Sequence, residues 1–137
     1  MTYYRKAVEL DPDWSWGHIR LGLTYNDMGQ YENAILEWQT LAELDHETPG
    51  EHAVCFVLMA NTYLEMDEYQ KAVEASQEAL RINPDSASAH YNLGRAYLEM
   101  GNKNLASEEY RTLKELDEEL AKEMYQFMNE SLGTLEQ

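Results

Sequence analysis

The sequence predicts an all-α solenoid, in which similar helix pairs stack side by side instead of enclosing one central core. Three tyrosines set the period, because the second and third lie 34 residues apart and the first and second lie 38 apart: Tyr25, Tyr63 and Tyr97. An alanine follows each of them by nine residues: Ala34, Ala72 and Ala106. Self-similarity with a period of about 20 to 50 residues is the signature of stacked repeats.

Each unit is expected to contain two helices joined by a tight turn. In residues 87–120, apolar residues recur at helical spacing up to Leu98 and again from Leu105, and Gly101-Asn102 interrupts the pattern. Two amphipathic helices around a short turn form a hairpin. Small residues recur where the two helices would cross, because small side chains let helices approach closely: Gly22, Ala60 and Gly94 in the first helices, and Ala34, Ala72 and Ala106 in the second. The tyrosine and a second aromatic residue, Trp38 or Tyr110, are expected to fill the space around the crossing.

The chain is expected to form one domain, residues 1–137, with three repeats at 15–48, 53–86 and 87–120. Residues 1–12 match the close of the second repeat, with Ala7 at the place of Ala79 and Pro12 at that of Pro84. We therefore expect this segment to end a preceding repeat of a longer array, and to leave an apolar stripe uncovered: Tyr3, Tyr4, Ala7 and Val8.

Residues 49–52 form an insertion between the first two repeats. Thr48 precedes Pro49, and Glu51 follows Thr48 by three residues. This order is typical of an N-cap, a proline at the first helical position and the glutamate of a capping box. Four residues make about one helical turn. The first helix of the middle repeat is therefore predicted to begin one turn early.

A final helix is predicted over residues 117–133, overlapping the end of the third repeat. Asp117 can cap its start, and Gly133 can end it. One face carries an apolar stripe that would cover the last repeat, whereas Glu123, Gln126 and Glu130 would face water. The stripe comprises Leu120, Met124, Phe127, Met128 and Ser131.

These residues together resemble the tetratricopeptide repeat: a small residue, a tyrosine three on, a glycine near the turn, an alanine nine after the tyrosine and a closing proline. The middle repeat matches best, with Ala60, Tyr63, Tyr69, Ala72, Ala79 and Pro84. His46 and Glu118 replace the proline in the first and third repeats. The resemblance covers nearly the whole chain and implies a right-handed superhelix with the first helices on its concave wall.

The resemblance also implies that a partner would lie in this concave groove. The positions that usually touch partners carry the following residues: Trp16, Ile19, Leu23, Asn26, Val54, Val57, Asn61, Leu64, Tyr91, Arg95 and Leu98. The apolar ones suit an amphipathic helix or extended segment, with Asn61 and Arg95 fixing its backbone or a carboxylate. The alternative is that Trp16, Ile19 and Val54 pack within the chain. Ile19 and Leu23 also replace residues that family members use to grip the carboxylate tails of heat-shock chaperones, which argues against that role.

The formal charge of −16 repels nucleic acid and anionic membrane surfaces and favours a partner of basic character. The alternative is that the acidic residues only coat the outer helix faces. The sequence has no apolar run of the roughly 20 residues that a membrane span needs, and no signal-peptide pattern. Cys55 is the single cysteine, so no internal disulfide can form. The compartment stays open, with the cytoplasm favoured.

No motif indicates an enzyme, a cofactor or a metal site. Residues 11–22 hint at a calcium loop, but Trp16 and Gly22 stand where that loop requires glycine and glutamate. His18 and His90 occupy equivalent positions in their repeats, which indicates packing instead of metal binding. A zinc site at His46 and His52 is conceivable but unspecific.

The sequence therefore predicts a non-catalytic scaffold that binds a protein or peptide partner in its groove. The alternative is self-association as a homodimer through the uncovered N-terminal end, with no peptide ligand.

Overall fold

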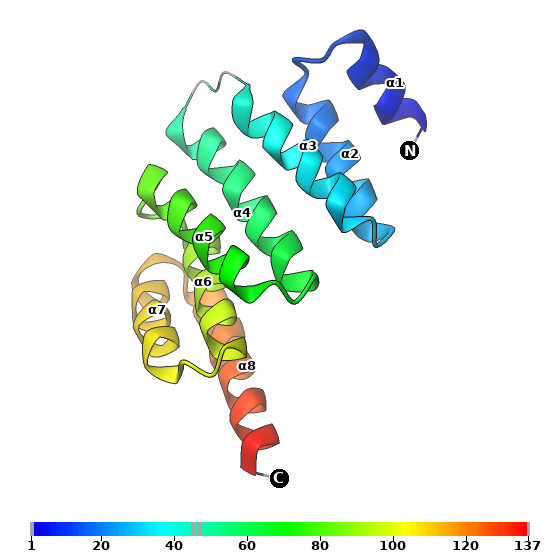
Figure 1. Ribbon diagram of the computed structural model, residues 1–137. Coiled ribbons are helices and arrows are strands. Elements are labelled where there is room, and N and C mark those ends of the chain that lie inside the picture. Colours follow the sequence, from blue (N-terminus) through cyan, green and yellow to red (C-terminus); the bar gives the residue numbers. More distant parts are fainter. Residues whose placement is uncertain (1, 45, 47, 137) are drawn as a thin grey trace.

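The computed structural model describes residues 2–44, 46 and 48–136, with side chains described up to residue 130. The described residues form eight helices and no strand (Figure 1). They are α1 (Thr2–Leu10), α2 (Ser15–Asp27), α3 (Tyr31–Glu43), α4 (Pro49–Glu65), α5 (Tyr69–Ile82), α6 (Ala87–Glu99), α7 (Lys103–Leu116) and α8 (Glu118–Glu136). None of these helices is long and apolar enough to cross a membrane.

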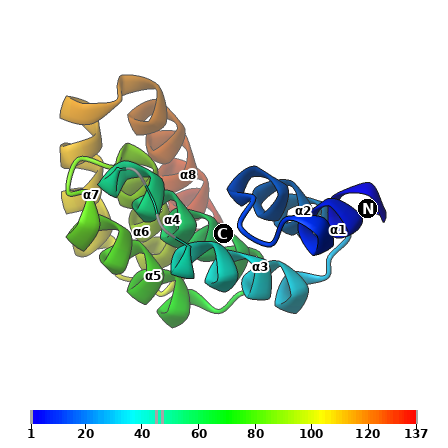
Figure 2. The same cartoon turned by 90° about the horizontal axis from the view of Figure 1, so that it is seen from above.

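Consecutive helices pack as three hairpins, α2–α3, α4–α5 and α6–α7, with α1 before them and α8 after them. Figure 1 shows the hairpins following one another in chain order, and Figure 2 shows from above that their row is curved. The last helix, α8, packs against both α6 and α7. The all-α solenoid predicted from the sequence is confirmed.

The turn inside each hairpin depends on one residue with positive φ. Gly29 and Gly101 have φ of 74° and 80°, and Asp67 has φ of 59° at the equivalent position of the middle hairpin. Glycine adopts this left-handed conformation without steric cost, and aspartate is among the residues that tolerate it best. Met28-Gly29, Met66-Asp67 and Met100-Gly101 therefore mark the three turns. The glycine near the turn that the resemblance implied is present in two of them.

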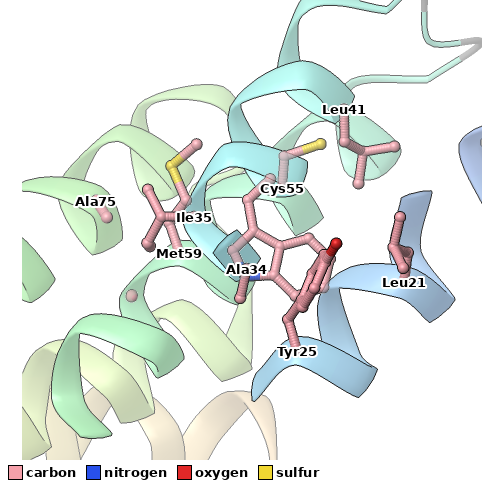
Figure 3. Close-up of a cluster of buried hydrophobic side chains, with 10 residues drawn as sticks. Leu21, Tyr25, Ala34, Ile35, Leu41, Cys55, Met59 and Ala75 are labelled. Carbon is pink, nitrogen blue, oxygen red and sulfur yellow. The ribbon is translucent and has the colours of Figure 1, made fainter. Parts of the chain in front are cut away.

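The first core joins α2 and α3 to α4 and α5 (Figure 3). Trp38 is almost fully buried, and its indole Nε1 donates to Thr62 Oγ1 on α4 at 3.0 Å. A Cβ placed on Gly22 would lie 2.6 Å from the Trp38 ring, so only glycine lets the ring approach α2 this closely. The small residue and Trp38 fill the crossing together, as predicted.

The first helix covers more of this core than the sequence suggested. Tyr4 and Val8 pack against the buried cluster around Trp38 and Tyr25, and Arg5 Nη2 donates to Tyr25 Oη at 3.0 Å. The expectation of an uncovered stripe that includes Tyr4 and Val8 is therefore wrong, because these side chains close the side of α2. Tyr3 and Leu10 are the large apolar side chains of α1 that stay exposed.

Both predicted helix starts are confirmed, and one predicted end is wrong. The helix α4 begins at Pro49, and Thr48 Oγ1 accepts from the Glu51 amide at 3.2 Å. Asp117 Oδ1 accepts from the amides of Glu119 and Leu120 at the start of α8. The helix α8 continues past Gly133 to Glu136, because one glycine costs a helix only about 1 kcal/mol. The side chain of Ser131 lies outside the described residues.

Candidate partner-binding groove

The predicted groove residues do not form one continuous surface; the structure divides them among two clefts and two packed regions. The clefts lie along the first helices of the hairpins, α2, α4 and α6. One packed region lies under α8, and the other lies where α4 and α5 meet α6. Each part has its own chemistry.

The first cleft, called here the apolar cleft, lies between the N-terminal halves of α2 and α4 and has a volume of about 530 Å³. Its predicted members are Trp16, Ile19 and Val54. Trp16 is 51% exposed and Val54 45% exposed, so both offer apolar surface to a partner. The Trp16 ring packs against two neighbouring aromatic rings, with its centroid 5.6 Å from that of Trp14 and 6.3 Å from that of Tyr4.

Four residues of the apolar cleft were missed by the sequence reasoning: Ser15, Leu41, His46 and Glu51. Leu41 comes from the second helix of its hairpin and His46 from the following connection, so neither occupies a usual partner position. The imidazole Nε2 of His46 lies 2.8 Å from the Leu41 carbonyl oxygen, and its ring stacks on His52 with centroids 5.2 Å apart. The connection before the insertion therefore forms one wall of the cleft.

The second cleft, called here the polar cleft, has a volume of about 300 Å³ and reaches from α2 across α4 to α6. It brings together five predicted residues, namely Leu23, Asn26, Asn61, Leu64 and Arg95, beside Trp38, Leu58, Thr62 and Glu65. Two of its polar atoms, Asn26 Oδ1 and Arg95 Nε, are buried and have no hydrogen-bond partner among the described residues. Buried polar atoms without partners are uncommon in folded proteins.

Arg95 is positioned by two aromatic rings. Its guanidinium carbon lies 5.8 Å from the Tyr91 ring centroid and 5.0 Å from that of Phe127 on α8. Cation–π contacts of this kind hold a guanidinium in place while leaving its N–H groups able to donate. Burial raises the pKa of the Tyr91 phenol. Tyr91 therefore supports Arg95 instead of offering a free surface.

Part of the predicted groove is filled by the chain itself. Tyr91 and Leu98 pack with Ala121 and Met124 of α8, so the wall of the third hairpin is covered by the last helix. Val57 is 8% exposed and packs on Ala79 and Ala89. The expectation that Val57 gives exposed apolar contact is wrong, because α5 and α6 cover it. Leu64, also 8% exposed, contributes only the floor of the polar cleft.

Acidic residues recur beside the polar cleft. Asp27, Glu65 and Glu99 are exposed at equivalent positions, each at the last residue of a first helix. Carboxylates at a helix C-terminus are disfavoured by the helix dipole, so these three do not stabilise their own helices. They make this end of the wall negative.

The other candidate sites of the sequence have structural partners. The described residues contain no group of three or more potential metal ligands. Glu47, which neighbours His46 in the sequence, lies outside the described residues. Cys55 is fully buried, and burial raises the pKa of its thiol to about 11. His18 and His90 each contact a glutamate of the next helix, at 2.7 and 2.6 Å.

Comparison with known families agrees with the repeat pattern and the fold. A family profile described as tetratricopeptide repeat matches residues 17–45 and 87–120, and a related repeat profile matches residues 60–101. The chain belongs to the tetratricopeptide-repeat family. Its hairpins thus form the right-handed superhelix that the resemblance implied.

Curated relatives are much longer than this chain. Anaphase-promoting complex subunit 3 of Schizosaccharomyces pombe is 24% identical over 115 residues, which are 84% of this chain and 17% of that protein. Tetratricopeptide repeat protein 12 of Homo sapiens is 25% identical over 102 residues, which are 74% of this chain and 14% of that protein. The chain thus spans about a sixth of the length of these relatives.

Solved structures share the same architecture. The crystal structure of MamA has a TM-score of 0.70 and 26% identity, covering 97% of this chain and 85% of that one. The Hsp90 co-chaperone Cns1 from Saccharomyces cerevisiae has a TM-score of 0.75 and 16% identity, covering 89% and 40%. The second tetratricopeptide domain of Spaghetti (RPAP3), bound to the HSP90 peptide SRMEEVD, has a TM-score of 0.66 and 21% identity, covering 75% and 92%. At the two lower identities the likeness shows the shared fold.

Proposed function

We propose that this chain is a non-catalytic scaffold that binds a segment of a protein partner along α2, α4 and α6. The observation that carries the proposal is the succession of two clefts on these helices. The apolar cleft exposes Trp16 and Val54, and the polar cleft holds the buried, unsatisfied atoms Asn26 Oδ1 and Arg95 Nε. Apolar anchoring at one end and backbone recognition at the other are the two needs of peptide binding.

The apolar cleft would supply most of the affinity. Burying one large apolar side chain is worth about 1.5–3 kcal/mol, and an interface tryptophan is often a hot spot. Two or three anchors against Trp16, Ile19 and Val54 would suffice for a dissociation constant of roughly micromolar order, after the cost of ordering the segment.

The polar cleft would orient the segment. An amide oxygen such as Asn26 Oδ1 can accept from a backbone N–H, and Arg95 can donate to a backbone carbonyl. Asn61, exposed between them, can do both. These groups recognise main chain, so they fix direction and register more than side-chain identity.

The charge of the chain favours a basic segment. Glu65 lines the polar cleft, Asp27 and Glu99 occupy the equivalent positions at the ends of α2 and α6, and the chain has a formal charge of −16. The RPAP3 neighbour is bound to an acidic peptide ending in Glu-Glu-Val-Asp. Here Ile19 and Leu23 face the apolar and polar clefts, and a carboxylate tail would meet like charge. An acidic tail peptide is therefore the expected non-binder.

Two synthetic amphipathic peptides test this proposal. They have leucines at identical positions, with lysine at every polar position of one and glutamate at every polar position of the other. Calorimetry should show binding of the lysine peptide only, weakened at least about tenfold by Trp16→Ala. Val54→Glu should also abolish binding, whereas Leu36→Glu, an equal charge change at an exposed leucine of α3, should not. If Val54→Glu and Leu36→Glu have equal effects, the binding depends only on the net charge of the chain, and the groove proposal is wrong.

Self-association is the second candidate, because Tyr3 and Leu10 stay exposed on α1. Light scattering on the calorimetry samples reports it directly. A dimer that Tyr3→Glu dissociates, together with no peptide binding, would replace the groove proposal. A monomer that binds the lysine peptide would remove this candidate.

A further inference from the structure

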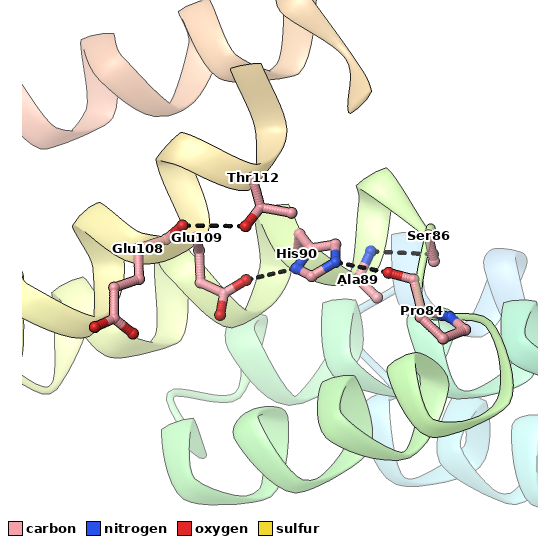
Figure 4. Close-up of polar contacts among 7 residues, drawn as sticks. All are labelled: Pro84, Ser86, Ala89, His90, Glu108, Glu109 and Thr112. Carbon is pink, nitrogen blue, oxygen red and sulfur yellow. Dashed lines mark hydrogen bonds and ion pairs between the residues drawn. The ribbon is translucent and has the colours of Figure 1, made fainter. Parts of the chain in front are cut away.

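His18 and His90 occupy the same place in the first and third hairpins, and each ring lies between two oxygen atoms. The Nδ1 atom of His90 lies 2.6 Å from Glu109 Oε2 on α7, and its Nε2 atom lies 2.9 Å from the Pro84 carbonyl oxygen (Figure 4). The corresponding distances from His18 are 2.7 Å to Glu37 Oε2 and 2.6 Å to the Pro12 carbonyl oxygen.

The chemistry of the two oxygens constrains the proton count. A carbonyl oxygen only accepts, and an ionised carboxylate only accepts, whereas a neutral imidazole has a single N–H. Two hydrogen bonds from one ring to such oxygens require a proton on both nitrogens. The geometry therefore calls for an imidazolium ion at each site, unless the carboxyl group keeps the proton.

The middle hairpin shows that these parts belong together. At its equivalent positions it has Phe56 instead of histidine and Ala75 instead of glutamate. Gly50 stands at the place of Pro12 and Pro84, and it lies in the first turn of α4 instead of in a connection. The histidine, the glutamate and the connecting carbonyl are thus all present in the first and third hairpins and all absent from the middle one.

We propose that each set is a proton-dependent clamp, made of His18, Glu37 and the Pro12 carbonyl in one hairpin and of His90, Glu109 and the Pro84 carbonyl in the other. The clamp joins the connection that enters the hairpin to both of its helices. Protonation closes it, and loss of the proton removes one of its two hydrogen bonds. The middle hairpin has no such dependence. This inference stands whether or not the groove binds a partner.

The charged groups around the rings support a retained proton. Glu109 from α7 and Asp85 from the α5–α6 connection face His90. Glu37 from α3 contacts His18, and Asp11 and Asp13 flank Pro12 in the sequence. The hydrogen bond from Glu109 raises the pKa of His90 above its ordinary value, with burial opposing and the Pro84 carbonyl and Asp85 reinforcing the rise.

The direction of the pH effect follows from the raised pKa. The folded chain binds the His90 proton more tightly than the unfolded chain does, so its contribution to stability is complete below the unfolded pKa of about 6.5. That contribution is lost as pH rises through the folded pKa.

Nitrogen-15 NMR of the imidazole rings in the wild-type chain tests the clamp directly. His90 should keep two protonated nitrogens to a higher pH than a model imidazole does, and His46 and His52 serve as internal references. A His90 ring that loses its second proton at or below the pH of a model imidazole, or a second proton that sits on Glu109, would overturn the proposal.

Denaturant unfolding between pH 6 and pH 9 tests its consequence. Glu37→Gln with Glu109→Gln should keep the hairpins closed, because an amide N–H can donate to a neutral ring, and should flatten the dependence of stability on pH. Glu32→Gln with Glu108→Gln, an equal charge change at exposed residues of the same two helices, should leave the dependence unchanged. A double variant with the wild-type slope would overturn the proposal, and if that variant does not fold, the NMR measurement decides alone.

Discussion

The middle hairpin and the two outer hairpins solve the same packing problem with different residues. Where α2 crosses α3, Gly22 leaves room for the large ring of Trp38. Where α4 crosses α5, Ala60 is larger and Ser76, at the place of Trp38, is smaller. The extra methyl group of Ala60 replaces only a small part of the volume by which Trp38 exceeds Ser76, so the two crossings are not matched residue for residue.

The ends of the hairpins differ in the same way. The outer hairpins close with a histidine, a glutamate and a carbonyl, whereas the middle one has Phe56 and Ala75 and a longer first helix. The helix α4 has 17 residues, compared with 13 each in α2 and α6. Apolar contact does not depend on pH, but a charge-assisted clamp does. We therefore expect the middle hairpin to lack the pH-dependent stability that we propose for the two outer hairpins.

Among the substitutions that test this comparison, removal of the Trp38 ring should change the free energy of unfolding most. Trp38→Ala is expected to lower the free energy of unfolding by about 3–5 kcal/mol, because it leaves a cavity beside Gly22 and detaches α3 from Thr62. Trp38→Phe should cost much less, since Thr62 Oγ1 keeps its bond to the Leu58 carbonyl. Denaturant unfolding measures both, and equal losses would show that the hydrogen bond and not the volume matters.

The two crossings of the outer hairpins that contain a glycine should respond differently to one added methyl group. A Cβ on Gly22 would meet the rigid Trp38 ring, so Gly22→Ala should cost about 1–3 kcal/mol. A Cβ on Gly94 would meet the end of the Met124 side chain, which can rotate away. Gly94→Ala should therefore be nearly neutral, because alanine also gains about 1 kcal/mol of helix propensity. Thermal unfolding that ranks the two variants in the opposite order would contradict this account.

A modest effect of the opposite sign is expected in the middle hairpin. Ser76 Oγ is buried without a hydrogen-bond partner among the described residues. Ser76→Ala should therefore raise the free energy of unfolding by about 1 kcal/mol, the cost of a buried hydroxyl without a partner. Ser107→Ala is the control, because the Ser107 hydroxyl already donates to the Lys103 carbonyl. A loss of stability in Ser76→Ala would show that the hydroxyl has an ordered water partner.

Features that depend on residues within one or two turns were predictable from the sequence. The caps at Thr48 and Asp117 and the turns at Gly29 and Gly101 depend on neighbouring backbone groups, and all four are as expected. The end of α8 was not, because a glycine only weakens a helix and the surrounding residues decide whether it continues.

Most of the candidate groove needed the structure. Repeat positions correctly placed Trp16, Ile19 and Val54 together, since equivalent residues of stacked units face the same side. They gave no sign that Ala79 and Ala89 bury Val57. The final helix was expected to cover the last repeat, but its contact with the groove residue Tyr91 was not. The period also aligned His18 with His90, but their glutamate partners lie 19 residues further along, on the next helix.

By itself, the sequence determined the repeat, the helix pairs and their caps, because periodicity and capping depend on residues close together in the chain. The tertiary structure decided which predicted wall residues are open and which are covered. It also placed His18 and His90 each between a carboxylate and a backbone carbonyl. Burial and hydrogen bonding between helices depend on how the hairpins stack, and the stacking sums contacts that no single segment contains.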